Sequence, residues 1–163
     1  MTGAPAGAVV IGVGNEFRGD DGLGPAVIAR LRKLALPGVR LAVSHGEPTE
    51  LLDLWSGTDL TIVIDAVCCE HTTPGRIWTT TAEAMASFTT ATSSHALGIA
   101  DAVKLGRVLD RVPDELVVIA VEAECFEAGT QLSVPVADAL PHVVTTVLAE
   151  LARHGLSTPP AAL

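Results

Sequence analysis

The stretch AVVIGVGNEFRGDDGLGPAVIARLRKLA, residues 8–35, predicts a strand, a glycine-studded turn and a helix. Residues 8–13 are a continuous apolar run, which is typical of a buried strand. Residues 24–35 place apolar side chains on one helical face, and Pro25 lies in the first turn, where proline is tolerated. This stretch begins a series in which strands and helices alternate.

The rest of the chain continues this alternation. Strands joined by helical crossovers imply an α/β fold, with a mostly parallel, twisted sheet of about five strands and helices on both faces. Pro141 lies inside the last predicted helix and is expected to kink or interrupt it. Residues 1–156 are expected to form a single domain, and residues 157–163 a flexible tail. The further strands are predicted over residues 39–44, 60–67, 75–81 and 115–124, and the further helices over 48–56, 94–110 and 135–155.

The composition excludes several classes of partner. Ten Lys and Arg against nineteen Asp and Glu give a formal net charge of −9, which disfavours binding to nucleic acid or to anionic lipid. Three cysteines, two of them adjacent, make a poor disulfide framework and fit a reducing compartment. The N-terminus lacks the features of a signal peptide, and no uninterrupted apolar run reaches the roughly 18 residues of a membrane span. We therefore expect a soluble, cytoplasmic protein with neither nucleic acid nor membrane as a partner.

The glycine-rich turn, residues 12–24, resembles a phosphate-binding loop only superficially. The dinucleotide fingerprint requires a small residue three positions after Gly14, where this chain has Phe17. The Gly-Lys-Ser/Thr sequence of a Walker motif is also absent from the turn. Asp20 and Asp21 would repel a phosphate but suit a cation. The turn therefore predicts a cation site, and we expect no nucleotide or organic cofactor.

Three polar residues are predicted to meet at one edge of the sheet. Asp21 lies beyond the first strand, Asp65 ends the third, and His95 follows the fourth. Ligands of parallel sheets gather at the carboxyl ends of the strands, so these side chains converge if the first and third strands are neighbours. Two carboxylates and one imidazole suit nickel, zinc, manganese or iron(II), and three ligands leave positions open for a substrate. The alternatives are local roles for each residue, such as complementing a helix N-terminus or capping a turn.

Two other groups offer different chemistry. Cys68, with His71 or His95, would make a cysteine peptidase, although a small apolar residue at a strand end is the more common role of such a cysteine. Glu122 and Glu124 lie at the end of the last predicted strand. They either line the crevice or mark the point where the chain returns to water.

Four segments occur in an order that resembles the hydrogenase maturation proteases. These endopeptidases remove a C-terminal extension from the large subunit of nickel–iron hydrogenases after nickel has been inserted. The resemblance extends from about Val9 to Leu151. Its segments are GVGNEFRGDDGLGP (12–25), LTIVIDAV (60–67), SSHALGIADAV (93–103) and VEAECFEAGTQLSVPV (121–136).

The resemblance implies a three-layer α/β/α sandwich and a metal-contacting trio. The trio falls on Asp21, Asp65 and His95, which would be both the catalytic and the metal-binding residues. Asn15 and Asp20 would shape the turn and support these residues from behind. The metal would be nickel contributed by the substrate, the partner would be the large-subunit precursor, and the protease is expected to be a monomer.

The chain departs from the family pattern at two places on the expected crevice. His45 and Glu47 replace part of an Asp-Gly-Gly-Thr type turn, and Glu122-Ala123 replaces a Glu-Pro pair. We expect Glu122 to line the substrate crevice. Three other functions stay open at this point: a nickel-dependent assembly chaperone that does not cut, the cysteine peptidase using Cys68, and a nucleotide-binding domain.

Overall fold

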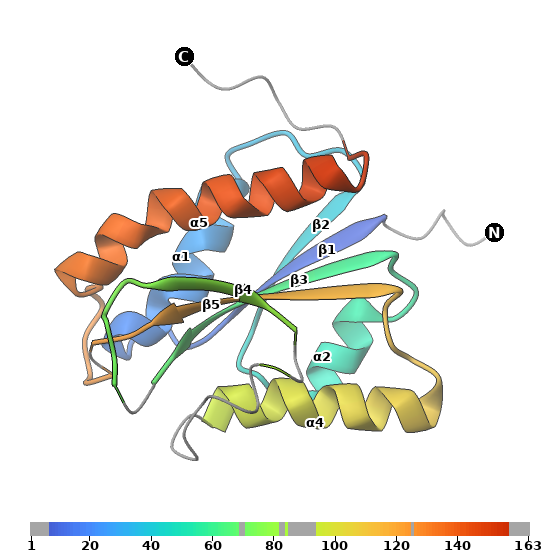
Figure 1. Ribbon diagram of the computed structural model, residues 1–163, viewed down its shortest axis with the longest axis horizontal. Coiled ribbons are helices and arrows are strands. Elements are labelled where there is room, and N and C mark those ends of the chain that lie inside the picture. The colour runs from blue at the N-terminus through green and yellow to red at the C-terminus, as the bar shows by residue number, and fades with distance from the viewer. Residues whose placement is uncertain (1–6, 69–70, 82–83, 85–93, 125, 157–163) are drawn as a thin grey trace.

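The computed structural model is built around a five-stranded sheet (Figure 1). It describes residues 7–68, 71–81, 84, 94–124 and 126–156, with the backbone alone for 94–97. The strand order is β2-β1-β3-β5-β4, and the first four of these strands are parallel. β1 and β3, which must be neighbours for Asp21 and Asp65 to converge, are paired, with Ala8 opposite Leu60. The strands are β1 (Ala8–Val13), β2 (Val39–Ser44), β3 (Leu60–Val67), β4 (Ile77–Thr80) and β5 (Glu115–Glu122).

Helices cover both faces of the sheet, which confirms the predicted α/β architecture. α1 and α5 lie on one face, and α2 and α4 lie on the other (Figure 1). A short 3-10 helix, η1, connects the glycine-rich turn to α1. These elements are η1 (Gly19–Gly22), α1 (Leu23–Leu31), α2 (Pro48–Trp55), α4 (Ser94–Leu109) and α5 (Val134–Arg153).

β4 runs antiparallel to β5, unlike its parallel neighbours. It follows β3 without a helical crossover, so the chain turns at the carboxyl edge and runs back along the sheet. The first helix is also shorter than the predicted 24–35. The amides of Lys33 and Leu34 bond to carbonyls three residues back, so the helix tightens into turns after Leu31.

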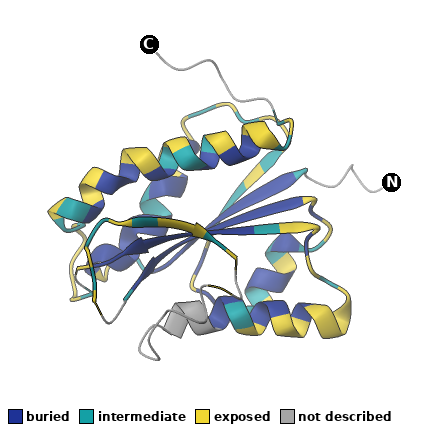
Figure 2. Cartoon of the chain, in the orientation of Figure 1, coloured by how far each residue is buried: buried dark blue, intermediate teal, exposed yellow. Residues whose placement is uncertain are grey.

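α5 continues through Pro141 without the predicted interruption. Pro141 lies on the exposed face, where the carbonyl that its missing N–H would have bonded can turn toward water. By length and composition alone α5 is able to cross a membrane, but its apolar face packs against the sheet. Figure 2 shows this division between a buried inner side and an exposed outer side. The predicted tail, 157–163, lies outside the described residues.

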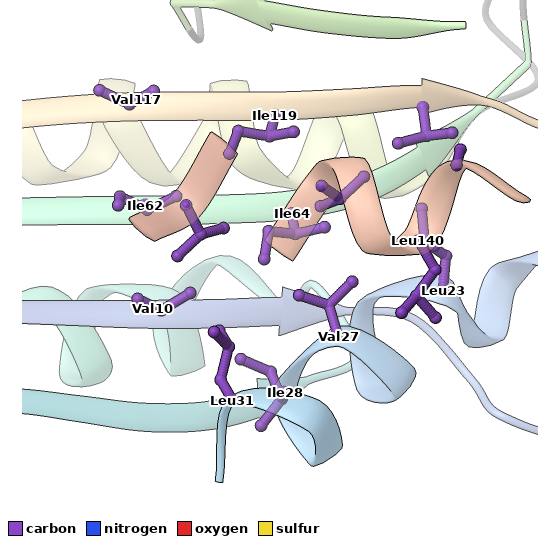
Figure 3. Close-up of a cluster of buried hydrophobic side chains, with 14 of the residues drawn as sticks. Val10, Leu23, Val27, Ile28, Leu31, Ile62, Ile64, Val117, Ile119 and Leu140 are labelled. Atoms are coloured by element: carbon purple, nitrogen blue, oxygen red, sulfur yellow. The ribbon is translucent and has the colours of Figure 1, made fainter. Parts of the chain in front are cut away.

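The sheet separates two apolar clusters because successive side chains of a strand point to opposite faces. Figure 3 shows the cluster between the sheet and the α1/α5 layer. On the other face, the indole of Trp55 is buried, and its Nε1–H donates to the Arg111 carbonyl at 2.9 Å. The labelled residues of the first cluster are Val10, Ile62, Ile64, Val117 and Ile119 from the strands, and Leu23, Val27, Ile28, Leu31 and Leu140 from the helices.

The C-terminus of α5 makes stability depend on pH. His154 bonds through Nε2 to the Glu115 carboxylate and through Nδ1 to the Glu150 carbonyl, and these bonds raise the pKa of the imidazole. The imidazole therefore binds its proton more tightly in the folded state than in the unfolded state. The resulting stabilisation of the fold is fully present below the unfolded pKa of about 6.5 and is lost as pH rises through the folded pKa.

We expect His154→Gln to lower the melting temperature at pH 5.5 and to have little effect at pH 9. The free-energy change should stay below about 1 kcal/mol, because the partner is exposed. Thermal melts at both pH values measure it, with His142→Gln on the exposed face of the same helix as the control. An equal loss at both pH values would contradict the pairing.

Candidate active site

The expected site lies where the carboxyl ends of β1 and β3 meet. β1 leads into the turn that carries Asp21, and Asp65 lies within the last three residues of β3. Because the two strands are adjacent and parallel, η1 contacts β3. Asp65 is fully buried and Asp21 is 3% exposed. The sheet thus brings two of the three predicted residues to one place.

A network of backbone contacts holds Asp21 in this turn. The Asn15 amide donates to Asp21 Oδ2 at 2.9 Å, while Asn15 Oδ1 accepts from the Phe17 amide at 2.9 Å. Gly14 has a φ of 140°, and a Cβ there would lie 1.9 Å from the Asp21 carbonyl oxygen. Only glycine fits this position. Gly14 and Asn15 therefore shape the turn around the Asp21 carboxylate.

The neighbouring Asp20 has a different set of partners. Its Oδ1 accepts from the Ser133 amide at 2.7 Å, and its Oδ2 accepts from the Ser133 hydroxyl and the Glu124 amide, both at 2.8 Å. All three donors belong to the connection between β5 and α5. The two adjacent aspartates are therefore not equivalent: Asp20 bonds across the molecule, whereas Asp21 bonds to its own turn.

Two other glycines of the first motif let a strand and a helix touch. A Cβ on Gly12 would lie 2.3 Å from the Gly24 carbonyl oxygen, and one on Gly24 would lie 2.5 Å from the Val13 carbonyl oxygen. β1 and α1 are thus in backbone contact. These glycines serve strand–helix packing, which accounts for them without any bound phosphate.

Glu122 lies at the end of β5, and its carboxylate is turned toward a neighbouring segment. Its Oε1 accepts from the Thr73 amide at 3.1 Å, and its Oε2 accepts from Trp78 Nε1 at 3.0 Å. The guanidinium of Arg76 lies 3.9 Å from the same carboxylate and 4.2 Å from the centre of the Trp78 ring. Both carboxylate oxygens therefore anchor the segment that leads into β4, at the edge where we expected Glu122 to line a crevice.

His95, the third predicted member, is the second residue of α4, and its side chain lies outside the described residues. The backbone of α4 nevertheless gives its location. A Cβ on Gly98 would lie 2.3 Å from the carbonyl oxygen of Gly46, in the loop that follows β2. The first turns of α4 therefore lie against that loop, at the carboxyl edge of the sheet. His45 and Glu47 flank Gly46 and are exposed.

Negative charge is concentrated at this edge. Five carboxylates are buried in the described chain, and four of them, all but Glu150, lie at the carboxyl edge. Such a set favours a cation over a phosphate. Within the described ranges, however, no three His, Cys, Asp or Glu side chains are placed to hold one metal ion together. The four edge residues are Asp20, Asp21, Asp65 and Glu122.

Comparison with known proteins identifies the family. The model of the HycI hydrogenase maturation protease family matches residues 41–150, about two-thirds of the chain. The chain belongs to the hydrogenase maturation protease family. It is 28% identical to the hydrogenase 2 maturation protease of Escherichia coli K12, over 93% of this chain and 94% of that one. It is 30% identical to the hydrogenase expression/formation protein HupM of Azotobacter chroococcum mcd 1, over 98% of this chain and 78% of that one.

Solved structures support the same assignment. The structure of the hydrogenase maturating endopeptidase HybD from E. coli superimposes with a TM-score of 0.85 at 28% identity, over 94% of this chain and 97% of that one. This similarity confirms the three-layer fold with its mostly parallel sheet. Membership of the family also makes the chain a peptidase by descent.

Cys68 lies half-buried just beyond β3 of this maturation protease. Burial raises the pKa of its thiol, and the negative charges of Asp65, Asp20 and Asp21 raise it further. The neutral thiol is a poor nucleophile, so this environment opposes a cysteine-peptidase mechanism.

We expect Cys68→Ala to retain most of the cleavage activity and thiol alkylation to leave the enzyme active. Rates of processing before and after treatment with iodoacetamide measure this. Loss of activity in both experiments would restore Cys68 as a candidate nucleophile. His71, its predicted partner, is exposed in the turn before β4.

Sequence reasoning missed one residue of this edge, Ser133. It occupies the N-cap of α5, yet its hydroxyl does not cap that helix and donates to Asp20 instead. The signal available in the sequence was a serine directly before an apolar helix that contains proline in its first turn. That pattern predicts a helix cap and gives no indication that the partner is Asp20.

Proposed function

We propose that this protein is an endopeptidase that removes the C-terminal extension of a nickel–iron hydrogenase large-subunit precursor after nickel has been inserted. The names of its relatives, which are maturation proteases of hydrogenases, support the kind of substrate. The observation that carries the proposal is the pair of buried carboxylates, Asp21 and Asp65, at the adjoining ends of β1 and β3. Gly12 and Gly24 of the first motif are explained by the packing of β1 against α1.

In this proposal the nickel is bound to the precursor, and the protease recognises it there. Asp21 and Asp65 offer carboxylate oxygens, and the imidazole of His95 is the proposed third ligand. Carboxylate and imidazole ligands suit a borderline divalent ion such as nickel(II), and an incomplete set leaves positions for ligands from the precursor.

The residues of this chain would then have two roles. Asp21 and Asp65 would bind the metal centre of the precursor, and this would place the scissile bond in the crevice. The Asn15 amide would keep the Asp21 carboxylate oriented. The nickel itself would supply Lewis-acid polarisation to the peptide carbonyl or to a water molecule. We further propose that the protein acts as a cytoplasmic monomer.

The intact mass of a large-subunit precursor, loaded with nickel or free of it, tests the proposal directly. Incubation with this protein should remove a short C-terminal peptide from the nickel-loaded precursor only. Cleavage without nickel would contradict metal recognition. A stable complex without any change in mass would indicate a non-cutting assembly chaperone instead.

A further inference from the structure

The connection between β5 and α5 is attached to the glycine-rich turn at three points. At its beginning the Glu124 amide donates to Asp20, and at its end the Ser133 amide and hydroxyl donate to the same carboxylate. In the middle, the Gly129 amide donates to the Phe17 carbonyl at 2.9 Å, and the Gly19 amide donates to the Gly129 carbonyl at 2.8 Å. The Asp20 side chain thus accepts hydrogen bonds from both ends of the loop, and backbone hydrogen bonds at Gly129 hold the middle of the loop.

This loop forms the wall of a hollow that Gly19 of the glycine-rich turn also lines. The hollow has a volume of about 410 Å³ and is lined by Gly19 and residues 127–131 of the loop. Gly19 directly precedes Asp20 and Asp21, so the hollow adjoins the turn that carries the proposed metal-binding carboxylate. Phe17, on the same turn, is 60% exposed, and Val134, directly after the loop, is 74% exposed. A hollow and exposed apolar side chains on the same two segments offer a surface to which an extended peptide can bind.

We infer that Asp20 is a positioning residue that closes the loop between β5 and α5 onto the turn carrying Asp21, so that the substrate-binding wall and the metal-binding carboxylate form one unit. The chemistry of Asp20 supports this role. Both oxygens of this buried carboxylate accept from the loop, through two backbone amides and one hydroxyl, and bonds to a carboxylate are stronger than bonds between neutral groups. Asp20 is therefore suited to hold the loop, whereas the Asp21 carboxylate accepts from the Asn15 amide of its own turn.

Replacement of Asp20 by asparagine tests this inference most sharply. Asparagine keeps the size of the side chain but has one acceptor oxygen, so its NH2 group would face an N–H donor of the loop. We expect the amides of Glu124 and Ser133 to exchange with solvent about tenfold faster, because the loop opens more often once a charge-assisted bond is lost. Amide hydrogen exchange of the protein alone measures this without any substrate.

Two further variants distinguish the loss of the Asp20 bonds to the loop from a general loss of stability. Asp21→Asn changes the adjacent charge but none of the three loop bonds, so it should leave both amides protected. Ser133→Pro removes the amide and hydroxyl donors together, and the φ of −60° at this position is compatible with proline. It should expose the Glu124 amide as Asp20→Asn does, and it keeps the test available if Asp20→Asn does not fold.

The kinetic part of the inference rests on the proposed function. With nickel-loaded precursor, Asp20→Asn should raise KM about tenfold and change kcat little, because saturating substrate selects the closed loop. Unchanged amide exchange in Asp20→Asn would overturn the inference, as would a loss of kcat at unchanged KM, which would place Asp20 among the reacting groups. If the wild-type protein does not cleave the precursor, the proposed function fails, and the exchange pattern still decides the role of Asp20 in holding the loop.

Discussion

Asp65→Asn is expected to lower kcat/KM for precursor processing by about 10²- to 10³-fold, the cost of removing one charged group at a reacting centre. The substitution keeps the shape of the side chain and removes its charge. Stability should stay equal or rise, because Asp65 is fully buried at an edge that also holds Asp20 and Asp21. A residue retained for function at a cost in stability shows this combination of effects.

Processing followed by intact mass, together with urea unfolding, measures both quantities. The matched control is Asp53→Asn on α2, where the carboxylate is 75% exposed and pairs with Arg111 at 3.0 Å. That variant should process the precursor at the wild-type rate. If Asp65→Asn remains fully active, the assignment of Asp65 to the site is wrong. If it is inactive only because it unfolds, the carboxylate is structural.

Gly12→Ala is expected to destabilise the fold by about 3 kcal/mol or more, as overpacking of a tight core contact does. The new Cβ would lie 2.3 Å from the Gly24 carbonyl oxygen and 2.7 Å from Ile28 Cγ1. Since one neighbour is backbone, β1 and α1 would have to separate. The midpoint of urea unfolding measures the loss, provided the m-value stays constant.

Gly57→Ala provides the comparison for this glycine. Gly57 has a φ of +77°, with no atom within 4 Å of an added Cβ, so its substitution costs only backbone strain of about 1 kcal/mol. Comparing the stability losses of the two variants distinguishes the cost of a steric clash from the cost of an unfavourable backbone conformation. Equal losses in the two variants would show that the contact between β1 and α1 can relax.

Much of this fold was predictable because local pattern and chain direction agree. β1, β3 and β5 contain long apolar runs, and alternation with helices predicts parallel strands whose carboxyl ends carry Asp21 and Asp65. The pairing of β1 with β3, which brings the two aspartates together, is seen only in the structure. The direction of β4 was not predictable, because its four residues have no pattern that distinguishes parallel from antiparallel pairing. The extent of α1 also depended on its last hydrogen bonds rather than on its apolar spacing.

The roles of the two adjacent aspartates were beyond the reach of sequence spacing. Asp20 bonds to Ser133, 113 positions away, and no periodicity relates such distant residues. The same applies to Glu122, whose partners Thr73 and Trp78 lie on a separate segment. The sequence shows which polar residues follow the strand ends. Only the tertiary contacts show which of these residues hold loops in place.

The burial of Asp65 also has a consequence for competing ions. A freely diffusing hydrated cation would have to shed much of its water shell to reach a fully buried carboxylate. A metal ion that another protein already coordinates has lost much of its water shell and avoids most of that cost. The depth of this carboxylate would thus act as a filter, rejecting dissolved ions in favour of an ion that another protein presents.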